Sequence, residues 1–280
     1  MTMNSRKAFK MFRSLDRDQI QFVLDKRMEG KNTVDEWLKV LSSVAVMDTY
    51  GDDAREKSGN LAVTFGIFFV FTIILTISKP VLFFFPIGFG FLFFYFFLTY
   101  IRLSRIDVGN HLRLFIVPLL DTMKDSLDPD TKIYLKMDFS MPIKKHNLIQ
   151  HQENERIGTI TVYRLNWMIG EIELKFGQKL KWEITDEVKE MLGKITDKAT
   201  KMKLNAEYEV SHLLNFYFYA PKGKYNPVDT SDKSVMEQDE YYVFNIQKKD
   251  TSKSLEEGME KEVFLEALDE ANAKFKKIDQ

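Results

Sequence analysis

Cysteine is absent from the 280 residues of this chain. Its absence excludes disulfide bonds, thiolate nucleophiles and sites in which cysteine holds zinc or an iron–sulfur cluster. An excess of charge of either sign is also absent, because 40 Lys and Arg residues balance 41 Asp and Glu residues. Since nucleic-acid-binding domains normally carry a basic surface, this balance gives no reason to expect a nucleic-acid partner.

Motifs of catalysis and cofactor binding are missing as well. The chain has no GxxxxGK[ST], HExxH or GxSxG motif and no EF-hand loop. Its one GxG, Gly88-Phe89-Gly90, lies in an apolar run and does not follow a strand. We therefore predict no catalytic residue, no cofactor and no metal ligand. An enzyme acting on a membrane-proximal substrate is an alternative that no motif supports.

Two long runs without any charged residue dominate what is present. Leu61–Ser78 and Pro80–Ile101 are almost entirely apolar or aromatic, and more than half of the 24 phenylalanines lie in them. As helices they would be roughly 27 and 33 Å long, against a bilayer hydrocarbon core of about 30 Å. We predict two membrane helices. The mixed charges of residues 1–60 predict that no cleaved signal peptide precedes them.

The short connection between the runs predicts an antiparallel hairpin whose second helix begins at Pro80. Lys79 is the only charge at its tip, whereas the outer flanks carry five basic residues: Arg55, Lys57, Arg102, Arg105 and Arg113. This asymmetry predicts insertion in the plasma (inner) membrane with both termini cytoplasmic. Because neither run contains an ionisable residue, a pump or coupled transporter is disfavoured.

Details inside the hairpin leave alternatives open. Thr64, Thr72 and Thr76 share one helical face with Phe68, which fits packing against the second helix or an oligomer interface. The second run contains Pro86, Gly88 and Gly90, which predict either a tolerated kink near its outer end or a shallow wedge that does not span.

The segment before the hairpin is predicted to be helical. Ser5–Leu15 is basic and amphipathic, so it would either lie on anionic lipid or be a frayed or docked terminus. A second helix would end at Gly30, and a third would start with a capping box formed by Thr33 and Glu36. Residues 48–60 are predicted to be a polar linker into the membrane.

Beyond Ile101 the pattern predicts an α+β domain. A helix broken near Pro118 comes first, followed by a strand in which Ile133, Leu135 and Met137 alternate with polar residues. Further strands are predicted at 159–167, 171–176, 179–184, 208–220 and 241–247, with a hairpin turn at Gly177-Gln178. Helices are predicted after a Thr185 cap and after a Ser254–Glu257 capping box. Adjacent strands with short turns favour an antiparallel sheet.

Candidate ligand-binding residues in this domain are few. His146, His151, Glu153 and Glu155 could hold a metal ion, although their spacing suits a solvated strand connection better. Lys222, Gly223 and Lys224 could meet a phosphate, but a loop with two lysines is common. His212 is expected to be a satisfied, half-buried residue, and the aromatic residues of 208–220 are expected to be core, with an apolar pocket as the alternative.

The sequence thus predicts three parts: a helical segment over 1–60, a transmembrane hairpin over 61–101 and a cytoplasmic α+β domain over 102–280. We expect an integral membrane protein that presents an interaction, sensing or scaffold domain. The alternative is an oligomerising effector that perturbs the bilayer when its cytoplasmic domain is triggered. The expected partners are the lipid bilayer and proteins at the cytoplasmic domain, with a homo-oligomer as a further option. The fragment from about residue 125 onward is expected to fold alone.

Overall fold

The computed structural model describes residues 3–154, 158–192, 206–254 and 257–278, and it divides the chain into two compact units. The helical unit comprises Met1–Asp25 and Val40–Val108. The sheet unit comprises Lys26–Lys39 and Gly109–Gln280. A short segment that precedes the apolar runs therefore belongs with the sheet.

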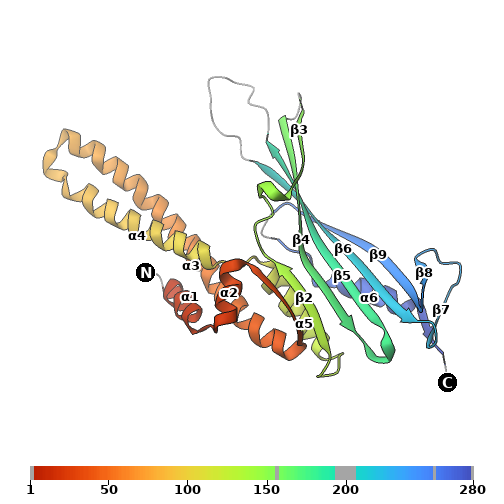
Figure 1. Cartoon of the computed structure of the whole chain (residues 1–280). Helices are drawn as coiled ribbons and strands as arrows, with labels where there is room; N and C mark the ends of the chain where they lie inside the picture. Colours follow the sequence, from red (N-terminus) through yellow and green to blue (C-terminus); the bar gives the residue numbers. More distant parts are fainter. Residues whose placement is uncertain (1–2, 155–157, 193–205, 255–256, 279–280) are drawn as a thin grey trace. The chain divides into compact units, whose positions relative to one another are not determined.

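The helical unit contains the predicted hairpin. Its elements are α1 (Met3–Ser14), α2 (Arg17–Asp25), α3 (Val34–Ser78, in this unit from Val40), a 3-10 turn (Pro80–Leu82) and α4 (Phe84–Ile106). The long parts of α3 and α4 run antiparallel, as Figure 1 shows. The helix expected at Ser5–Leu15 is confirmed as α1.

The polar linker predicted for residues 48–60 does not exist, because α3 is one helix of 45 residues. Ion pairs one turn apart support the helix here: Lys57 lies 2.8 Å from Asp53, and Arg55 lies 3.1 Å from Asp52. Ala54 and Ser58 are buried. The polar composition suggested a linker, but these residues form a helix that is buried on one face.

The tip of the hairpin also differs from the prediction. The second helix begins at Phe84 rather than at Pro80, after a turn in which the Leu82 N–H donates to the Lys79 carbonyl at 3.0 Å. Pro86 is therefore the third residue of α4. The first four N–H groups of a helix have no partner inside it, so this proline removes no hydrogen bond and gives no physical reason for a kink.

The sheet unit is built around an eight-stranded sheet whose described pairings are all antiparallel. Its main order is β1-β2-β4-β5-β6-β9-β8, and β3 pairs with β4. A separate ladder joins β7 and β10. The strands are β1 (Arg27–Thr33), β2 (Lys132–Asp138), β3 (Leu148–Asn154), β4 (Gly158–Glu173), β5 (Lys179–Leu192), β6 (Glu207–Pro221), β7 (Tyr225–Pro227), β8 (Val235–Gln238), β9 (Tyr241–Ser252) and β10 (Phe275–Lys277). The α+β class and the antiparallel sheet are confirmed.

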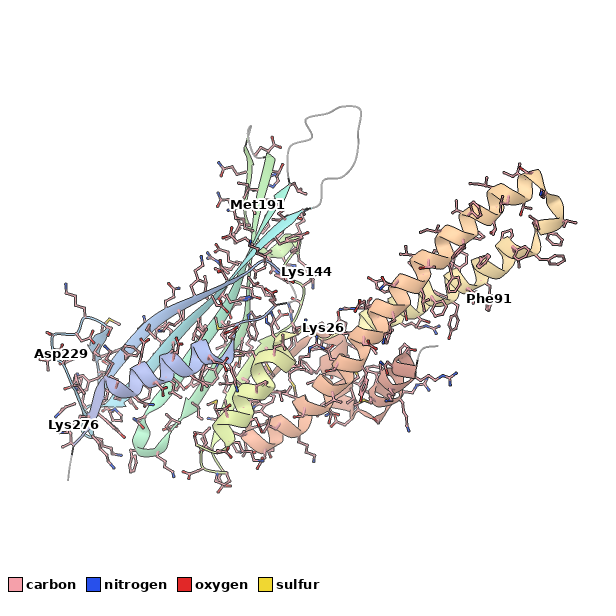
Figure 2. All side chains as sticks on the ribbon, turned by 180° about the vertical axis from the view of Figure 1, so that it is seen from behind. Lys26, Phe91, Lys144, Met191, Asp229 and Lys276 are labelled. Carbon is pink, nitrogen blue, oxygen red and sulfur yellow. The ribbon has the colours of Figure 1, made fainter. Side chains whose placement is uncertain are left out.

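Helices pack on one side of this sheet and form the core with it. A π-helical turn (Leu112–Ile116) leads into α5 (Val117–Lys124), and α6 (Lys261–Ala273) runs along the sheet in Figure 2. Phe264 of α6 is fully buried. Its ring lies 5.3 Å from that of Trp182, 5.4 Å from that of Phe216 and 6.5 Å from that of Phe115, measured between centroids.

The segment before the hairpin enters this core. The chain leaves helix at Asp25 and forms β1, so the helix predicted to end at Gly30 is wrong from residue 26 onward. The capping box is confirmed: the Glu36 N–H donates to Thr33 Oγ1 at 3.3 Å, and the Thr33 N–H donates to Glu36 Oε2 at 2.9 Å. Trp37 is fully buried, and its Nε1–H donates to the Ile133 carbonyl at 2.9 Å.

The helix predicted after Thr185 is wrong, because β5 continues to Leu192 and pairs with strands on both sides. The rest of that predicted helix, residues 193–205, lies outside the described residues. The strands predicted at 159–167 and 171–176 are one long strand, β4, with a register shift between Asn166 and Met168. The predicted β4–β5 hairpin is confirmed, and Gly177 at its turn has a φ of 81°.

The last helix begins later than predicted. Its N-cap is Glu260 and its first residue Lys261, so a capping box at Ser254 and Glu257 does not open it. Residues 255–256 lie outside the described residues. The expected broken helix around Pro118 is present as the π-helical turn followed by α5.

Candidate functional site

The helical hairpin is held together by glycines that lie against aromatic rings. A Cβ added at Gly90 would meet the Phe69 ring at 2.9 Å, and one added at Gly66 would meet the Phe93 ring at 3.2 Å. Near the base of the hairpin, Gly59 lies in the same way against Tyr100. Small residues let helix backbones approach closely, so these positions explain how two Phe-rich helices pack together.

Stacked rings fill the rest of this contact. Phe65 stacks on Phe96 with centroids 5.6 Å apart, and Phe68 stacks on Phe89 at 5.4 Å. The threonine hydroxyls find their hydrogen-bond partners inside α3, because they donate to carbonyls one turn earlier, and Thr72 is buried. Thr72 Oγ1, for example, donates to the Phe68 carbonyl at 2.8 Å. The oligomer interface considered for the threonine face remains a prediction.

The outer surface of the hairpin is apolar and exposed. Ile77 and Val81 expose 80% and 84% of their surface, and Phe91 projects outward from α4 in Figure 2 with 72% exposed. Both helices are long and apolar enough to cross a membrane, with only 11% and 17% of their most apolar windows buried. Contiguous apolar patches are rarely exposed on monomeric soluble proteins.

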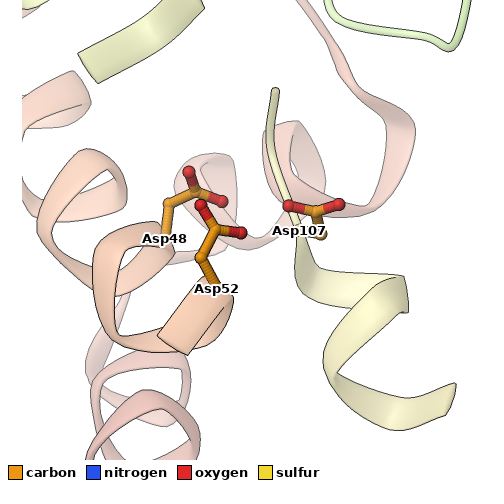
Figure 3. A group of neighbouring side chains, drawn as sticks. All are labelled: Asp48, Asp52 and Asp107. Carbon is orange, nitrogen blue, oxygen red and sulfur yellow. The ribbon is translucent and has the colours of Figure 1, made fainter. Parts of the chain in front are cut away.

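Three aspartates gather at the base of the hairpin, within the helical unit (Figure 3). Asp48 and Asp52 come from α3, and Asp107 follows α4; their ligand atoms lie within 4.8 Å of one another. Asp48 Oδ1 accepts the Val108 N–H at 2.7 Å, while Arg55 pairs with both Asp52 and Asp107. No local sequence pattern indicates this group, because Asp107 is distant in sequence from the other two aspartates. The Arg55 guanidinium already supplies positive charge there, and the group joins the two helices.

A buried polar network occupies the core of the sheet unit. Asp186 on β5 is directly opposite His212 on β6, and His212 Nδ1 lies 2.6 Å from Asp186 Oδ1. Trp167 Nε1–H donates to the same oxygen at 3.0 Å, and His111 Nε2 lies 3.1 Å from Asp186 Oδ2. His111 also stacks on Trp167 with centroids 4.4 Å apart. One carboxylate therefore accepts hydrogen bonds from side chains of three separate segments.

The carboxylate in this network is stabilised in its ionised form. Burial alone would raise the pKa of Asp186, but hydrogen bonds from His111 and His212 and their charges outweigh burial and hold it below the usual value. His212 is fully buried, not half-buried as the sequence suggested. Every second residue of β5 and β6 points into the core, and Asp186 and His212 fall at such positions. The incorrect prediction of a helix after Thr185 hid this pattern.

The network resembles a nucleophilic triad in its connectivity but not in its geometry. Ser252 Oγ lies 3.4 Å from His212 Nε2, at the outer limit of a hydrogen bond, and it donates to the Ser254 carbonyl at 3.0 Å. A nucleophile needs its proton directed at the base and its oxygen open to substrate. Because His212 is completely buried, the arrangement suits a structural role.

The residues that the sequence suggested as ligands either lie apart from one another or already contact other groups of the protein. His151 Nδ1 lies 3.1 Å from Thr161 Oγ1. Among the described residues, neither His146 nor Glu153 belongs to a group of side chains that could hold a metal ion. Glu155 lies outside the described residues. Lys222 pairs with Glu237 at 3.0 Å, and Lys224 Nζ donates to the Phe176 carbonyl at 3.2 Å.

The aromatic residues of β6 are divided between its two faces. Phe216 and Phe218 are buried in the core, as the sequence predicted. Tyr219 lines a small cavity of about 210 Å³ with Lys179, Lys181 and Tyr241.

Comparisons of the chain with protein-family models, curated proteins and solved structures find no significant match.

Proposed function

We propose that this chain is an integral membrane protein whose hairpin holds the sheet unit at a membrane surface, where that unit acts in interaction, sensing or scaffolding. The observation that carries the proposal is the exposed apolar surface of α3 and α4. In a helix the backbone N–H and C=O groups bond to one another, so such a hairpin can enter hydrocarbon without leaving backbone groups unpaired.

The distribution of basic residues supports one orientation. Arg102 and Arg105 lie just after the apolar part of α4, Arg55 and Lys57 lie just before that of α3, and Lys79 is alone at the tip. Because cytoplasmic flanks are enriched in Lys and Arg, the tip would be outside and both termini would be in the cytoplasm of the plasma (inner) membrane.

A role in interaction is favoured over catalysis because the histidine and aspartate side chains that could act in catalysis are buried. The His–Asp network of the described residues is buried beneath the sheet, whereas the opposite face of the sheet carries exposed charge pairs. Arg164 pairs with Glu187 at 2.8 Å and Lys189 with Glu209 at 3.4 Å on that face. A polar, ordered sheet face of this kind suits recognition of a protein partner.

Single-cysteine labelling in intact cells tests the proposal, because the native chain has no cysteine. Ser78→Cys should react with a membrane-impermeant thiol reagent, while Glu56→Cys and Lys253→Cys should react only after permeabilisation. All three positions are exposed in the structure, so protection would report the membrane rather than packing. Labelling of Glu56→Cys with protection of Ser78→Cys would reverse the orientation, and extraction of the protein by carbonate would overturn membrane integration.

The alternative effector function makes a different prediction about assembly. A bilayer-perturbing oligomer would give a detergent-solubilised particle containing several hairpins, whereas a presenting scaffold requires only one. Light scattering coupled to size-exclusion chromatography separates the two, and a monomeric particle would count against the effector.

A further inference from the structure

A basic cavity lies within the helical unit, between its first helix and the end of the hairpin. It has a volume of about 610 Å³ and is lined by Arg6, Phe9, Lys10 and Arg13 of α1 and by Arg102 of α4. Four of its five lining side chains are cations. No carboxylate lines it, so its chemistry selects an anion.

The cations of α1 point to one side because of their spacing. Positions three and four apart share a face of a helix, and Arg6, Lys10 and Arg13 follow this spacing. The opposite face of α1 is buried at Ser5 and Ala8, which fixes the direction in which the cations project.

Contacts with α3 hold α1 in place. The Lys7 ammonium lies 5.2 Å from the centroid of the Tyr50 ring, and the Asn4 amide donates to Asp53. A docked helix loses less conformational freedom on binding a ligand than a free terminus does. The four cationic side chains are exposed, but the helix that carries three of them is fixed in place by these contacts.

The charges in the cavity are also uncompensated. Among the residues that the structure describes, Arg6, Lys10, Arg13 and Arg102 make no ion pair with a carboxylate, in contrast to Arg55 or Lys57. Three of the four are arginines, whose planar guanidinium groups bind phosphate oxygens in pairs. Phe9 adds an apolar surface beside them.

The position of Arg102 in the sequence indicates the source of the anion. It directly follows the last residue of the charge-free run that ends at Ile101. If the hairpin spans the bilayer as proposed above, the cavity lies at the level of the lipid headgroups. We infer that this cavity binds the phosphate of an anionic lipid headgroup, an assignment that rests on the proposed membrane function.

Native mass spectrometry of the full-length protein in detergent tests the inference, with phosphatidylglycerol and phosphatidylcholine as probes. The unmodified protein should bind phosphatidylglycerol at least about tenfold more tightly, since each Lys or Arg near an anionic headgroup contributes about fivefold in affinity. A variant with Arg6, Lys10, Arg13 and Arg102 all changed to Gln should lose about 10²-fold or more.

A matched control removes the same charge elsewhere. Lys144, Lys145, Lys253 and Lys276 are exposed in the sheet unit, and changing all four to Gln should leave the lipid preference unchanged. A variant with Arg6→Lys, Arg13→Lys and Arg102→Lys keeps the charge and should retain most of the preference. Its retention would show that the loss in the Gln variant comes from charge and not from misfolding.

Soluble probes separate a lipid from a free anion. Binding of glycerol 3-phosphate or inorganic phosphate as tightly as phosphatidylglycerol would overturn the lipid assignment. Equal affinity of the unmodified protein for both lipids, or equal losses in the Gln variant and the lysine control, would overturn the site. Carbonate extraction of the same preparations reports membrane integration separately. A protein that resists extraction but shows no lipid preference would contradict only this inference.

Discussion

Gly170 on β4 is directly opposite Trp182 on β5, and the indole ring covers the glycine so closely that a Cβ there would fall 2.0 Å from the ring. Trp182 is fully buried and packs edge-on against Phe264 of α6. The absence of a side chain at residue 170 is therefore what lets the Trp182 indole lie against the neighbouring strand and still contact the helix.

Gly170→Ala should destabilise the sheet unit, at the upper end of the roughly 1–3 kcal/mol that overpacking costs, because the indole or the strand must move. All three tryptophans lie in the sheet unit, so the tryptophan fluorescence of the full-length protein during denaturation reports that unit alone. Gly223→Ala is the control: no atom lies within 4 Å of its Cβ position, and a change within about 0.5 kcal/mol is expected. Equal effects of the two would contradict the packing described.

Asp186→Asn should destabilise the sheet unit by about 3–5 kcal/mol, because it removes one partner of a buried ionic network. The new amide would also place a donor where His111, Trp167 and His212 all direct N–H groups. Glu187→Gln is the matched control, since the adjacent residue lies on the outer face and pairs with Arg164 while 34% exposed. It should cost less than about 1 kcal/mol. A small effect of Asp186→Asn would show that the network contributes little to stability.

The contribution of Asp186 should depend on pH with a definite sign. Its pKa in the folded protein lies below the ordinary value of 3.8, so the folded state binds protons less readily than the unfolded state does. The stabilisation is therefore fully present above pH 3.8 and is lost as the pH falls from there toward the folded-state pKa. The difference in unfolding free energy between the native protein and Asp186→Asn should therefore shrink as the pH falls below about 4. A difference that grows on acidification would contradict this assignment of charge.

The contact between α3 and α4 can be tested by two glycines less than one turn apart. Gly90→Ala places a methyl group 2.9 Å from the Phe69 ring, whereas the Cβ position at Gly88 has no atom within 4 Å. Gly88→Ala should be neutral or stabilising by up to about 1 kcal/mol through helix propensity. Gly90→Ala should melt at a lower temperature in detergent, followed by circular dichroism. The reverse order would mean that the hairpin is packed differently.

A fragment that begins near residue 125 should fail to fold, contrary to the expectation from the sequence, because Trp37 and Phe115 belong to the same core. Without residues 26–39 the edge of β2 is also unpaired, which favours aggregation. A shortened chain that joins residues 26–39 to 109–280 through a flexible linker should give dispersed amide NMR signals. Dispersed signals from the shorter fragment would show that β1 and the π-helical turn are dispensable.

The sequence by itself determined the features that depend on local composition and period. Charge-free runs at Leu61–Ser78 and Pro80–Ile101 predicted the long apolar helices, because a window of about 20 apolar residues has few other stable structures. Strict alternation at Ile133, Leu135 and Met137 predicted β2, and the Thr33–Glu36 spacing predicted a capping box that the hydrogen bonds confirm.

Tertiary structure decided the features in which local preferences were ambiguous or partners were distant. Residues 186–192 fit either a helical or a strand period, and pairing with β4 and β6 on both sides selected the strand. That choice turned Asp186 inward to meet His212 and brought His111 to it from a segment far away in the chain. The polar stretch 48–60 became helix because one of its faces found packing and ion pairs. In each case the deciding energy comes from contacts between residues remote in sequence, which no local window contains.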